Sequence, residues 1–374
     1  MDNLLINSMS RTGTSLLYQL LYGSKFIKFP PYRIQFVCSN PYGFPFNYKK
    51  NLKNKNNFVD ILLNSTTVPV NILESTDWTN IKIKKVSDIV KLDELKILEK
   101  HNYNLVDIPL LDRAISILNR FFNIRFENEK YFCLHEDHSF VLGGNYLLSN
   151  RINKILTTIR NPIDMIASKK NMLIYHYFGK KDPLKVELAD EVIEKEIIRA
   201  LFSWVVSSYE YSNNIGFPVL FESLKNDNKK LVLEKICEYL SIPYESIMKS
   251  EKNKFNPNGN ELLFTGSSLK QVSNNKYNTT VGTSKITLLS SEIEKINQLV
   301  DLSPIKDLLY ADVSNFYKNF KSLWKYYDNP KLPELNYWFN LYKQGNSEKI
   351  FKKYSSYNYG KSNSDQAFKI NQCT

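Results

Sequence analysis

Apolar and polar residues are arranged along this chain in a pattern that predicts short buried strands followed by amphipathic helices. Apolar runs before loops predict strands over residues 3–7, 130–137, 153–160 and 216–224. Apolar residues at helical spacing predict helices over residues 15–22, 88–100, 105–122, 162–173, 187–211, 228–240 and 291–300. Because strands alternate with helices, we expect an α/β fold whose central, mostly parallel sheet is flanked by helices.

Two parts of the chain lack this alternation of predicted strands and helices. Residues 30–104 are rich in Asn, Lys and Pro, and they predict an irregular insertion that contains the helix over 88–100. Residues 315–374 carry many aromatic and basic side chains. They predict a helical C-terminal extension that docks on the rest of the chain, in preference to a tail that binds nucleic acid. We therefore expect one large domain over residues 1–314, followed by this extension over residues 315–374.

The composition is that of a basic, soluble protein. The 374 residues are 43% hydrophobic, and the formal net charge is +12 with an isoelectric point near 9.2. A basic balance suits an anionic ligand, although lysine is frequent along the whole chain. The four cysteines are far apart, which argues against a zinc site or a disulfide framework. With no recognisable signal peptide and no apolar run long enough to span a bilayer, we expect a cytoplasmic location.

The loop between the first predicted strand and helix has the residues of an anion site. Backbone N–H groups at the start of a helix lack partners within the helix, and the helix dipole favours negative charge there. The glycine lets the backbone turn, the arginine adds positive charge, and the hydroxyl side chains add donors. The candidate ligands are Ser10, Arg11, Thr12, Gly13, Thr14 and Ser15. The alternative is an ordinary helix N-cap. The loop lacks the lysine of the triphosphate-binding pattern GxxxxGK[ST].

A second candidate lies where the strand predicted over residues 153–160 ends. Arg160 ends that strand, and Asn161 and Pro162 suit the N-cap and the first helical position. Asp164 falls in the first turn of the helix, and Ser168 lies two turns, roughly 10 Å, beyond the cap. A ligand that touches both Arg160 and Ser168 must therefore lie alongside the first turns. Two separated anion sites at the ends of parallel strands predict a nucleotide with two separated phosphates.

The two motifs, in this order, resemble those of sulfotransferases that use 3′-phosphoadenosine 5′-phosphosulfate. In that family a strand-loop-helix of the type [PS]-[KR]-[ST]-G-[ST]-[ST] holds the 5′-phosphosulfate, and residues 10–15 match it. A later strand-helix of the type R-[ND]-P-x-D-x-x-x-S holds the 3′-phosphate, and residues 160–168 fill every position. Gly282, Lys285 and Leu288 resemble the late segment G-x-W-K-x-x-L. The resemblance runs with gaps from residue 3 to about residue 310.

The resemblance implies the P-loop-like sulfotransferase fold, with residues 1–314 as the catalytic domain. It implies this sulfuryl donor, no metal, and donor ligands that include Arg160, Ser168, Gly282 and Lys285 in addition to the first loop. Three departures concern how the nucleotide is covered. Ser284 replaces the tryptophan of the late segment, Leu16 replaces an adenine-facing tryptophan, and the Arg-Lys-Gly triplet that often clamps the 3′-phosphate is absent.

The resemblance also implies a catalytic base, His or Glu, just after the strand that precedes the Arg160 strand. In this sequence the stretch is LHEDHSF, where His138 is the first choice and a shifted alignment favours His135 or Glu136. These side chains do not suggest a metal site, because adjacent residues on a strand point to opposite faces. Arg11 stands at the family's lysine position and would neutralise charge on the transferred group, although arginine does not donate its proton.

We therefore expect transfer of a sulfuryl group to a hydroxyl or amine of an unidentified acceptor, either a carbohydrate or a small molecule. The expected partners exclude nucleic acid and a membrane span, and the oligomeric state stays open. Two alternatives remain. A kinase-like phosphotransferase could use the same fold, but the missing lysine and magnesium-binding carboxylates count against it. A non-catalytic member could bind the nucleotide or a glycan without any transfer.

Overall fold

The structure is a computed structural model of the whole chain, and the residues that it describes fall in several ranges. These are 2–9, 12–22, 24–28, 33–34, 66–69, 83–85, 127–137, 154–178, 182–244, 282, 284–327, 332–344 and 367–369. The helices predicted over 88–100 and 105–122 lie outside them.

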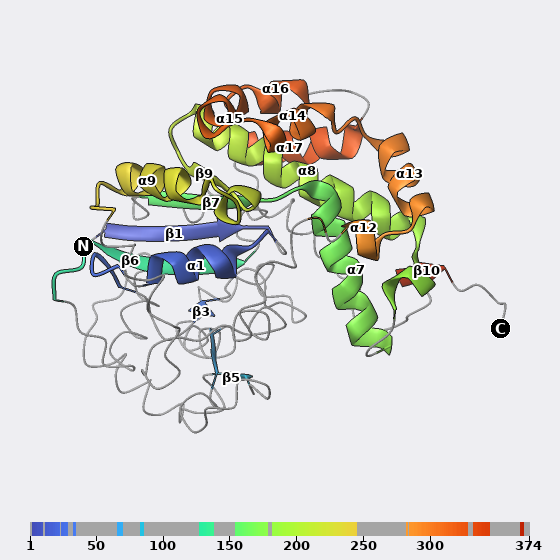
Figure 1. Cartoon of the computed structure of the whole chain (residues 1–374), viewed down its shortest axis with the longest axis horizontal. Coiled ribbons are helices and arrows are strands. Elements are labelled where there is room, and N and C mark those ends of the chain that lie inside the picture. The colour runs from blue at the N-terminus through green and yellow to red at the C-terminus, as the bar shows by residue number, and fades with distance from the viewer. Residues whose placement is uncertain are drawn as a thin grey trace.

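The centre of the molecule is a parallel five-stranded sheet (Figure 1). Its strands are β1 (Asp2–Ser8), β2 (Ile27–Lys28), β6 (Tyr131–Asp137), β7 (Lys154–Ile159) and β9 (Phe217–Leu220). Their order is β2-β6-β1-β7-β9, and all four neighbouring pairs are parallel. The prediction of an α/β fold with a mostly parallel central sheet is therefore confirmed.

The register brings the carboxyl ends of the strands to one edge of the sheet. Ser8 at the end of β1 pairs with Asp137 of β6 and with Thr158 of β7. Ile159 at the end of β7 pairs with Leu220 of β9. The segments that follow β1, β7 and β9 therefore leave the sheet side by side, as ligand-binding loops do in open parallel sheets.

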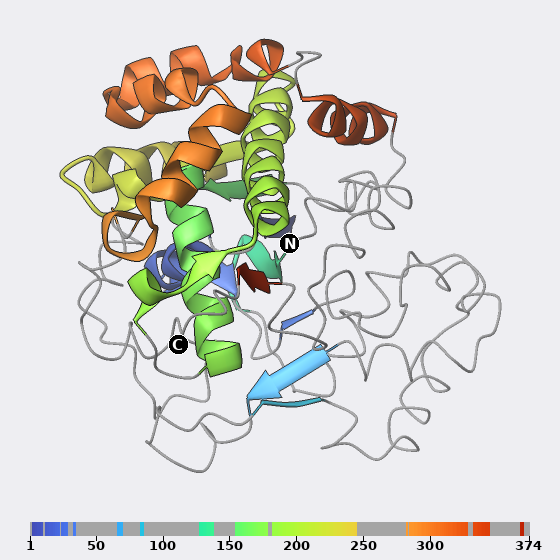
Figure 2. The same ribbon diagram turned by 90° about the vertical axis from the view of Figure 1, so that its right-hand side faces the viewer.

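The helices of the described residues follow the predicted pattern closely. Helices α1 (Thr14–Tyr22) and α9 (Lys229–Leu240) lie on the same face of the sheet, as two views agree (Figures 1 and 2). Helix α7 (Pro162–Phe178) continues five residues past its predicted end at residue 173. Helix α8 (Asp190–Ser212) begins at Asp190 and not at residue 187, because β8 (Glu187–Leu188) pairs antiparallel with β10 (Phe368–Lys369).

The strand predicted over residues 216–224 is shorter than expected. Strand β9 ends at Leu220, and the chain then turns through a short 3₁₀ helix, Glu222–Leu224. The apolar run does not distinguish the two parts, because Phe221 and Leu224 are buried in the turn as well. This turn carries Phe221 and Glu222 to the edge where the parallel strands end.

The predicted insertion over residues 30–104 contains a small sheet. Strands β3 (Arg33–Ile34), β4 (Thr66–Pro69) and β5 (Ile83–Lys85) pair antiparallel in the order β3-β4-β5. Figure 2 shows this sheet below the main one. The prediction of an irregular segment is wrong at these positions. Strands of two to four residues are too short to display alternation in sequence, so pairing between distant segments decides them.

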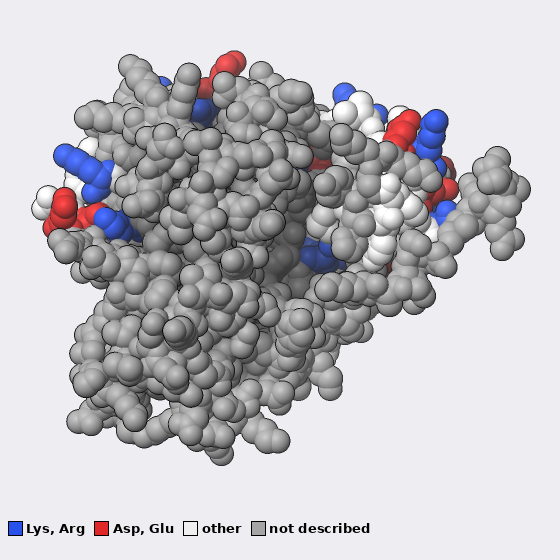
Figure 3. Space-filling view, turned by 90° about the horizontal axis from the view of Figure 1, so that it is seen from below, with Lys and Arg blue, Asp and Glu red and all other residues white. Residues whose placement is uncertain are grey.

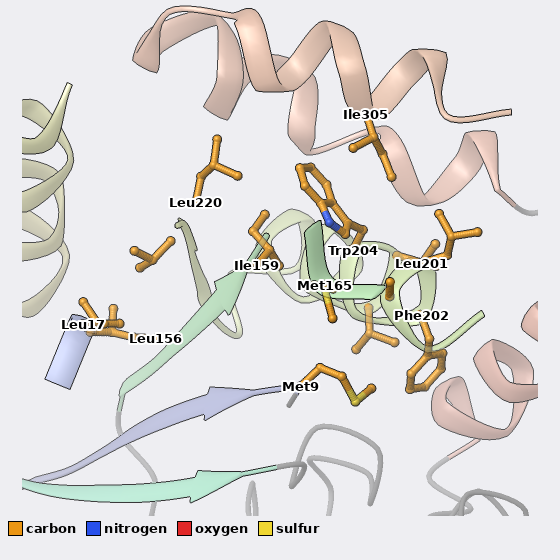
Figure 4. Packing of buried hydrophobic residues seen from close by; sticks show 14 of the residues in the cluster. Met9, Leu17, Leu156, Ile159, Met165, Leu201, Phe202, Trp204, Leu220 and Ile305 are labelled. Carbon is orange, nitrogen blue, oxygen red and sulfur yellow. The ribbon is translucent and has the colours of Figure 1, made fainter. Parts of the chain in front are cut away.

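The core is continuous from the main sheet to the C-terminal helices. Trp204 of α8 lies among the apolar side chains near Ile159 at the end of β7, and Ile305 reaches toward it from above (Figure 4). Trp204 and Ile159 are fully buried. Trp204 is therefore a core residue. Within the described residues, no helix combines the length and apolar character that crossing a bilayer requires.

The C-terminal helices pack on α7 and α8. These are α12 (Ser284–Thr287), α13 (Ser290–Leu299), α14 (Ser303–Tyr310), α15 (Val313–Phe320), α16 (Leu323–Tyr326) and α17 (Pro333–Lys343). Helices α13, α16 and α17 contact α8 directly. The Tyr317 hydroxyl donates to the Pro218 carbonyl over 3.2 Å, and the Ser208 hydroxyl accepts from the Trp324 amide over 3.1 Å. Over residues 315–327 and 332–344 the helical character of the extension is confirmed; the domain boundary predicted after residue 314 falls inside α15 and stays a prediction.

Glu210 connects α8 to the last of these helices. Its Oε1 accepts a hydrogen bond from the hydroxyl of Tyr342 on α17, and the side chain is 1% exposed. Burial raises the pKa of Glu210 from its ordinary value of 4.5 to about 7, although the Tyr342 hydrogen bond acts in the opposite direction. The folded protein therefore binds a proton at Glu210 at pH values where the unfolded chain has already lost it.

Stability is expected to fall as pH rises from 4.5 to 7, because only the unfolded state gains a solvated carboxylate over this range. The loss attributable to Glu210 is about 3 kcal/mol. Glu210→Gln keeps an acceptor for Tyr342 and removes the titration, so the variant should lose less stability between these pH values than the wild type. Urea unfolding at pH 5 and pH 8 measures the difference. An unchanged pH dependence in Glu210→Gln would contradict the buried position of this carboxyl.

Candidate functional site

The first predicted anion loop leads from β1 into α1. Gly13 has a φ of +91°, so the backbone makes the turn that the glycine predicts. The Gly13 carbonyl accepts from the amides of Leu16 and Leu17 at 3.0 and 3.3 Å, which starts the helix. Ser10 and Arg11 lie outside the described residues, and for Ser15 only the backbone is described.

The threonine hydroxyls of this loop connect it to β7. Thr12 is fully buried, and its hydroxyl donates to the Met9 carbonyl over 2.7 Å. The same hydroxyl lies 2.7 Å from the hydroxyl of Thr158, which is 3.5 Å from that of Thr14. The Thr12 hydroxyl therefore serves the shape of the loop, and it ties the loop to the strand that ends in Arg160. Its role as a ligand of the donor stays a prediction.

Phe221 joins the two predicted motifs. A Cβ atom added at Gly13 would lie 2.0 Å from Cδ2 of Phe221, so the ring packs directly on the glycine backbone. The same ring also contacts Arg160. Its centroid lies 4.6 Å from Cζ of Arg160, which is the geometry of a cation–π interaction. The first loop and Arg160 thus lie on the same edge of the sheet and touch the same side chain.

A hydrogen bond to its carbonyl holds the backbone of Arg160 in place. Its carbonyl accepts a hydrogen bond from Nε1 of Trp204 over 2.8 Å, and the residue is only 5% exposed. Burial lowers the pKa of Arg160, whereas the nearby carboxylates of Glu222 and Asp164 act to raise it. Arginine stays charged in proteins despite such shifts, so Arg160 is a positive charge in a largely desolvated position.

Glu222 holds the turn that follows Arg160. Its Oε1 accepts the Asn161 amide over 2.9 Å, while the Asn161 side chain accepts the Ile163 amide over 3.0 Å. Asn161 is thus the N-cap of α7, as predicted. Glu222 is partly exposed as a residue, but its Oε2 is buried. Burial raises the pKa of Glu222 to about 7, and the Asn161 amide and the charge of Arg160 act to lower it.

Asp164 in the first turn of α7 binds the late segment of the chain. Its Oδ2 accepts the Gly282 amide over 2.8 Å, and its Oδ1 accepts the Ser284 amide over 3.0 Å. Two helical turns farther on, the side-chain amide of Asn171 donates to the Thr287 hydroxyl over 3.2 Å. Helix α12 therefore lies along α7, as Figure 1 shows. The sequence assigned Asp164 only to the first turn of its own helix.

This contact places the predicted ligands Gly282 and Lys285 beside the helix that carries Ser168. Lys285 is exposed, and Ser168 is partly exposed. The Lys285 amide donates to the Gly282 carbonyl over 3.2 Å, so the two residues belong to one turn. No ligand contact tests these three positions, and their roles stay predictions.

Asp164→Ala is expected to speed hydrogen exchange at the Gly282 and Ser284 amides by about ten- to hundredfold. Each amide loses a hydrogen bond to a charged acceptor, which contributes about 1.5–3 kcal/mol. Exchange measured by mass spectrometry or NMR should leave the amides of β1 unchanged. Asp164→Asn keeps an oxygen acceptor without the charge and should give an intermediate rate. Equal exchange in Asp164→Ala and the wild type would show that the carboxylate does not hold this segment.

The candidate bases lie beside the first loop as far as the backbone is described. Strand β6 neighbours β1, with His135 opposite Ile6 and Glu136 opposite Asn7. Both positions are therefore near the carboxyl edge of the sheet, where the loop begins. His138, the first choice for the base, lies outside the described residues, and the side chains of His135 and Glu136 are not described. The choice among the three stays a prediction.

Sequence reasoning did not foresee how Phe221, Glu222, Trp204 and Thr158 support this site. The signal for Phe221 and Glu222 was their place just after a strand of the parallel sheet. Trp204 and Thr158 carried no signal, because a buried indole or hydroxyl in an apolar run looks like core in sequence. Their contacts with Arg160 and Thr12 depend on segments far apart in the chain.

Seen from below, the described residues show a group of basic side chains near the middle of the surface (Figure 3). Positive charge of this kind favours an anionic ligand. Among the residues that the structure describes, no group of three or more His, Cys, Asp or Glu side chains is placed to hold a metal ion.

Solved sulfotransferase structures resemble this chain at low identity. The sulfotransferase domain from the curacin biosynthetic pathway covers 80% of this chain and 97% of its own, with 14% identity and a TM-score of 0.41. A sulfotransferase from Alicyclobacillus acidocaldarius covers 84% and 98%, with 13% identity and a TM-score of 0.36. The sulfotransferase domain from the Synechococcus PCC 7002 olefin synthase covers 88% and 96%, with 14% identity and a TM-score of 0.39.

No protein-family model and no curated protein matches the sequence. The TM-scores of these structural likenesses are all below 0.5.

Proposed function

We propose that this protein is a sulfotransferase that moves a sulfuryl group from 3′-phosphoadenosine 5′-phosphosulfate to a hydroxyl or amine of an acceptor. One observation carries the proposal: Gly13 of the first loop and Arg160 of the second motif both contact Phe221 at the same edge of the sheet. Two predicted anion sites that are about 150 residues apart in sequence are thus neighbours in space. A donor with phosphate groups on both sides of one ribose suits such a pair of sites.

The described residues suit the binding and orientation of this donor. Arg160 is a buried cation whose backbone is held by Trp204 and whose following turn is held by Glu222 and Asn161. A charge fixed in this way attracts the 3′-phosphate without further rearrangement of the protein. The turn at Gly13 brings the N-terminus of α1 to the same edge, where its dipole favours the 5′-phosphosulfate.

Sulfuryl transfer needs in-line geometry, stabilisation of spread negative charge and a base for the acceptor proton. We assign charge stabilisation to the loop amides, Thr14 and Arg11, and we assign the base to His138, with His135 or Glu136 as alternatives. The acceptor is a carbohydrate or a small molecule that carries the attacked hydroxyl. The reaction requires no metal in this scheme.

Transfer of radiolabelled sulfate from the donor to a panel of glycans, phenols and amines tests the proposal. We expect label in at least one acceptor and release of adenosine 3′,5′-bisphosphate in equal amount, without magnesium. His138→Ala should keep donor binding and lose the transfer. Magnesium-dependent transfer of phosphate from ATP would indicate the kinase-like alternative instead. Tight binding of the bisphosphate with no transfer to any acceptor, and no effect of His138→Ala, would indicate a non-catalytic nucleotide-binding protein.

A further inference from the structure

Two basic side chains lie over the same aromatic ring at the edge of the sheet. Cζ of Arg160 is 4.6 Å from the centroid of Phe221, and Nζ of Lys225 is 5.6 Å from that centroid. Lys225 directly follows the 3₁₀ turn Glu222–Leu224, and its amide donates to the Glu222 carbonyl over 3.0 Å. The backbone of Lys225 is therefore fixed next to the Arg160 site, and its side chain reaches over the ring of Phe221.

The positive charges of Arg160 and Lys225 repel each other. Burial and, to a smaller extent, the charge of Arg160 together lower the pKa of Lys225 from 10.5 to about 8. Each charge over Phe221 gains some attraction from the ring face, but this attraction does not remove the repulsion between them. An anion with two negative charges that binds between or beside them would relieve it, because such an anion attracts both cations.

The two carboxylates near Arg160 already accept hydrogen bonds from backbone amides. Oε1 of Glu222 accepts the Asn161 amide over 2.9 Å. Asp164, the other carboxylate near Arg160, accepts the amides of Gly282 and Ser284. Both carboxylates therefore hold the turns on either side of Arg160 through backbone hydrogen bonds.

We infer that Lys225 is a second cationic ligand for the phosphate group that binds at Arg160, and that it makes the site selective for a phosphate monoester dianion. The inference rests on the proposed function, in which this group is the 3′-phosphate of the donor. Lys225 thereby supplies positive charge where the Arg-Lys-Gly triplet of related sequences is missing. The resemblance in sequence did not indicate this residue.

Binding of two nucleotides, measured by titration calorimetry, tests this role. Adenosine 3′,5′-bisphosphate carries the 3′-phosphate, and adenosine 5′-phosphate lacks it. Lys225→Met should weaken binding of the bisphosphate about tenfold and leave binding of the monophosphate unchanged, because one charge-assisted contact is lost from one phosphate. Lys225→Arg keeps the charge and should restore most of the affinity, which a purely structural role of the lysine stem would not explain.

Lys230→Met is the matched control. Lys230 lies on α9 with a side chain that is 70% exposed and 3.8 Å from Glu234, so its loss should change neither affinity. Thermal unfolding of each variant verifies that the fold is intact. Equal loss of affinity for both nucleotides, or no loss for either, would overturn the role of Lys225 and leave the proposed function in place. A wild-type protein that fails to bind the bisphosphate would overturn both.

Discussion

Gly13→Ala is expected to lower the free energy of unfolding by about 3 kcal/mol and to abolish any activity of the site. Two effects add. The φ of +91° disfavours every residue with a Cβ atom by about 1–2 kcal/mol. In addition, the new methyl group would lie 2.0 Å from Cδ2 of Phe221, so the ring or the loop must move, and overpacking of this kind costs about 1–3 kcal/mol.

Gly282→Ala separates these two effects. Gly282 also has a positive φ, +72°, but an added Cβ atom would meet no other atom within 4 Å. This variant should lose only the backbone contribution, about 1 kcal/mol. Removal of the ring in Gly13→Ala/Phe221→Ala should recover the steric part of the loss relative to Phe221→Ala alone. Urea unfolding measures all four variants, and equal losses in Gly13→Ala and Gly282→Ala would refute the contact between Gly13 and Phe221.

Arg160→Met should weaken binding of adenosine 3′,5′-bisphosphate by about a hundredfold or more. Arg160 is 5% exposed as a residue and its backbone is held by Trp204, so its bonds to a phosphate would form in a desolvated and preorganised position. A loss of about 3 kcal/mol corresponds to this factor. Binding of adenosine 5′-phosphate should change much less, because the first loop is untouched.

Arg160→Met needs a control for its effect on the stability of the fold. Removal of the Arg160 charge takes a cation away from Glu222 and Asp164, and it removes an effect that lowers the pKa of Glu222. Arg160→Met/Glu222→Gln removes one of these carboxylates and keeps an oxygen acceptor for the Asn161 amide, so it should fold at least as well as the single variant. A folded double variant that binds the bisphosphate as tightly as the wild type would exclude Arg160 from the phosphate site.

The order of strands and helices along the chain was predictable, because buried positions form local patterns of apolar residues in the sequence. Strand β7, with five consecutive buried residues, and helix α9, with an apolar face, are each specified by residues that are neighbours in sequence. The N-cap Asn161 was predictable for the same reason, since a cap depends on its own side chain and the next amides. The strands β3 to β5 and β8 were not, because partners far away in the chain define them.

The sequence by itself determined the α/β architecture, the turn at Gly13 and the two anion motifs, since each depends on residues within one short segment. Only the tertiary structure decided that Phe221 lies between Gly13 and Arg160, that Asp164 holds Gly282 and Ser284, and that Lys225 shares the ring with Arg160. The physical reason is that these contacts join separate segments. Their geometry follows from the register of parallel strands and the packing of helices, which no local pattern of residues encodes.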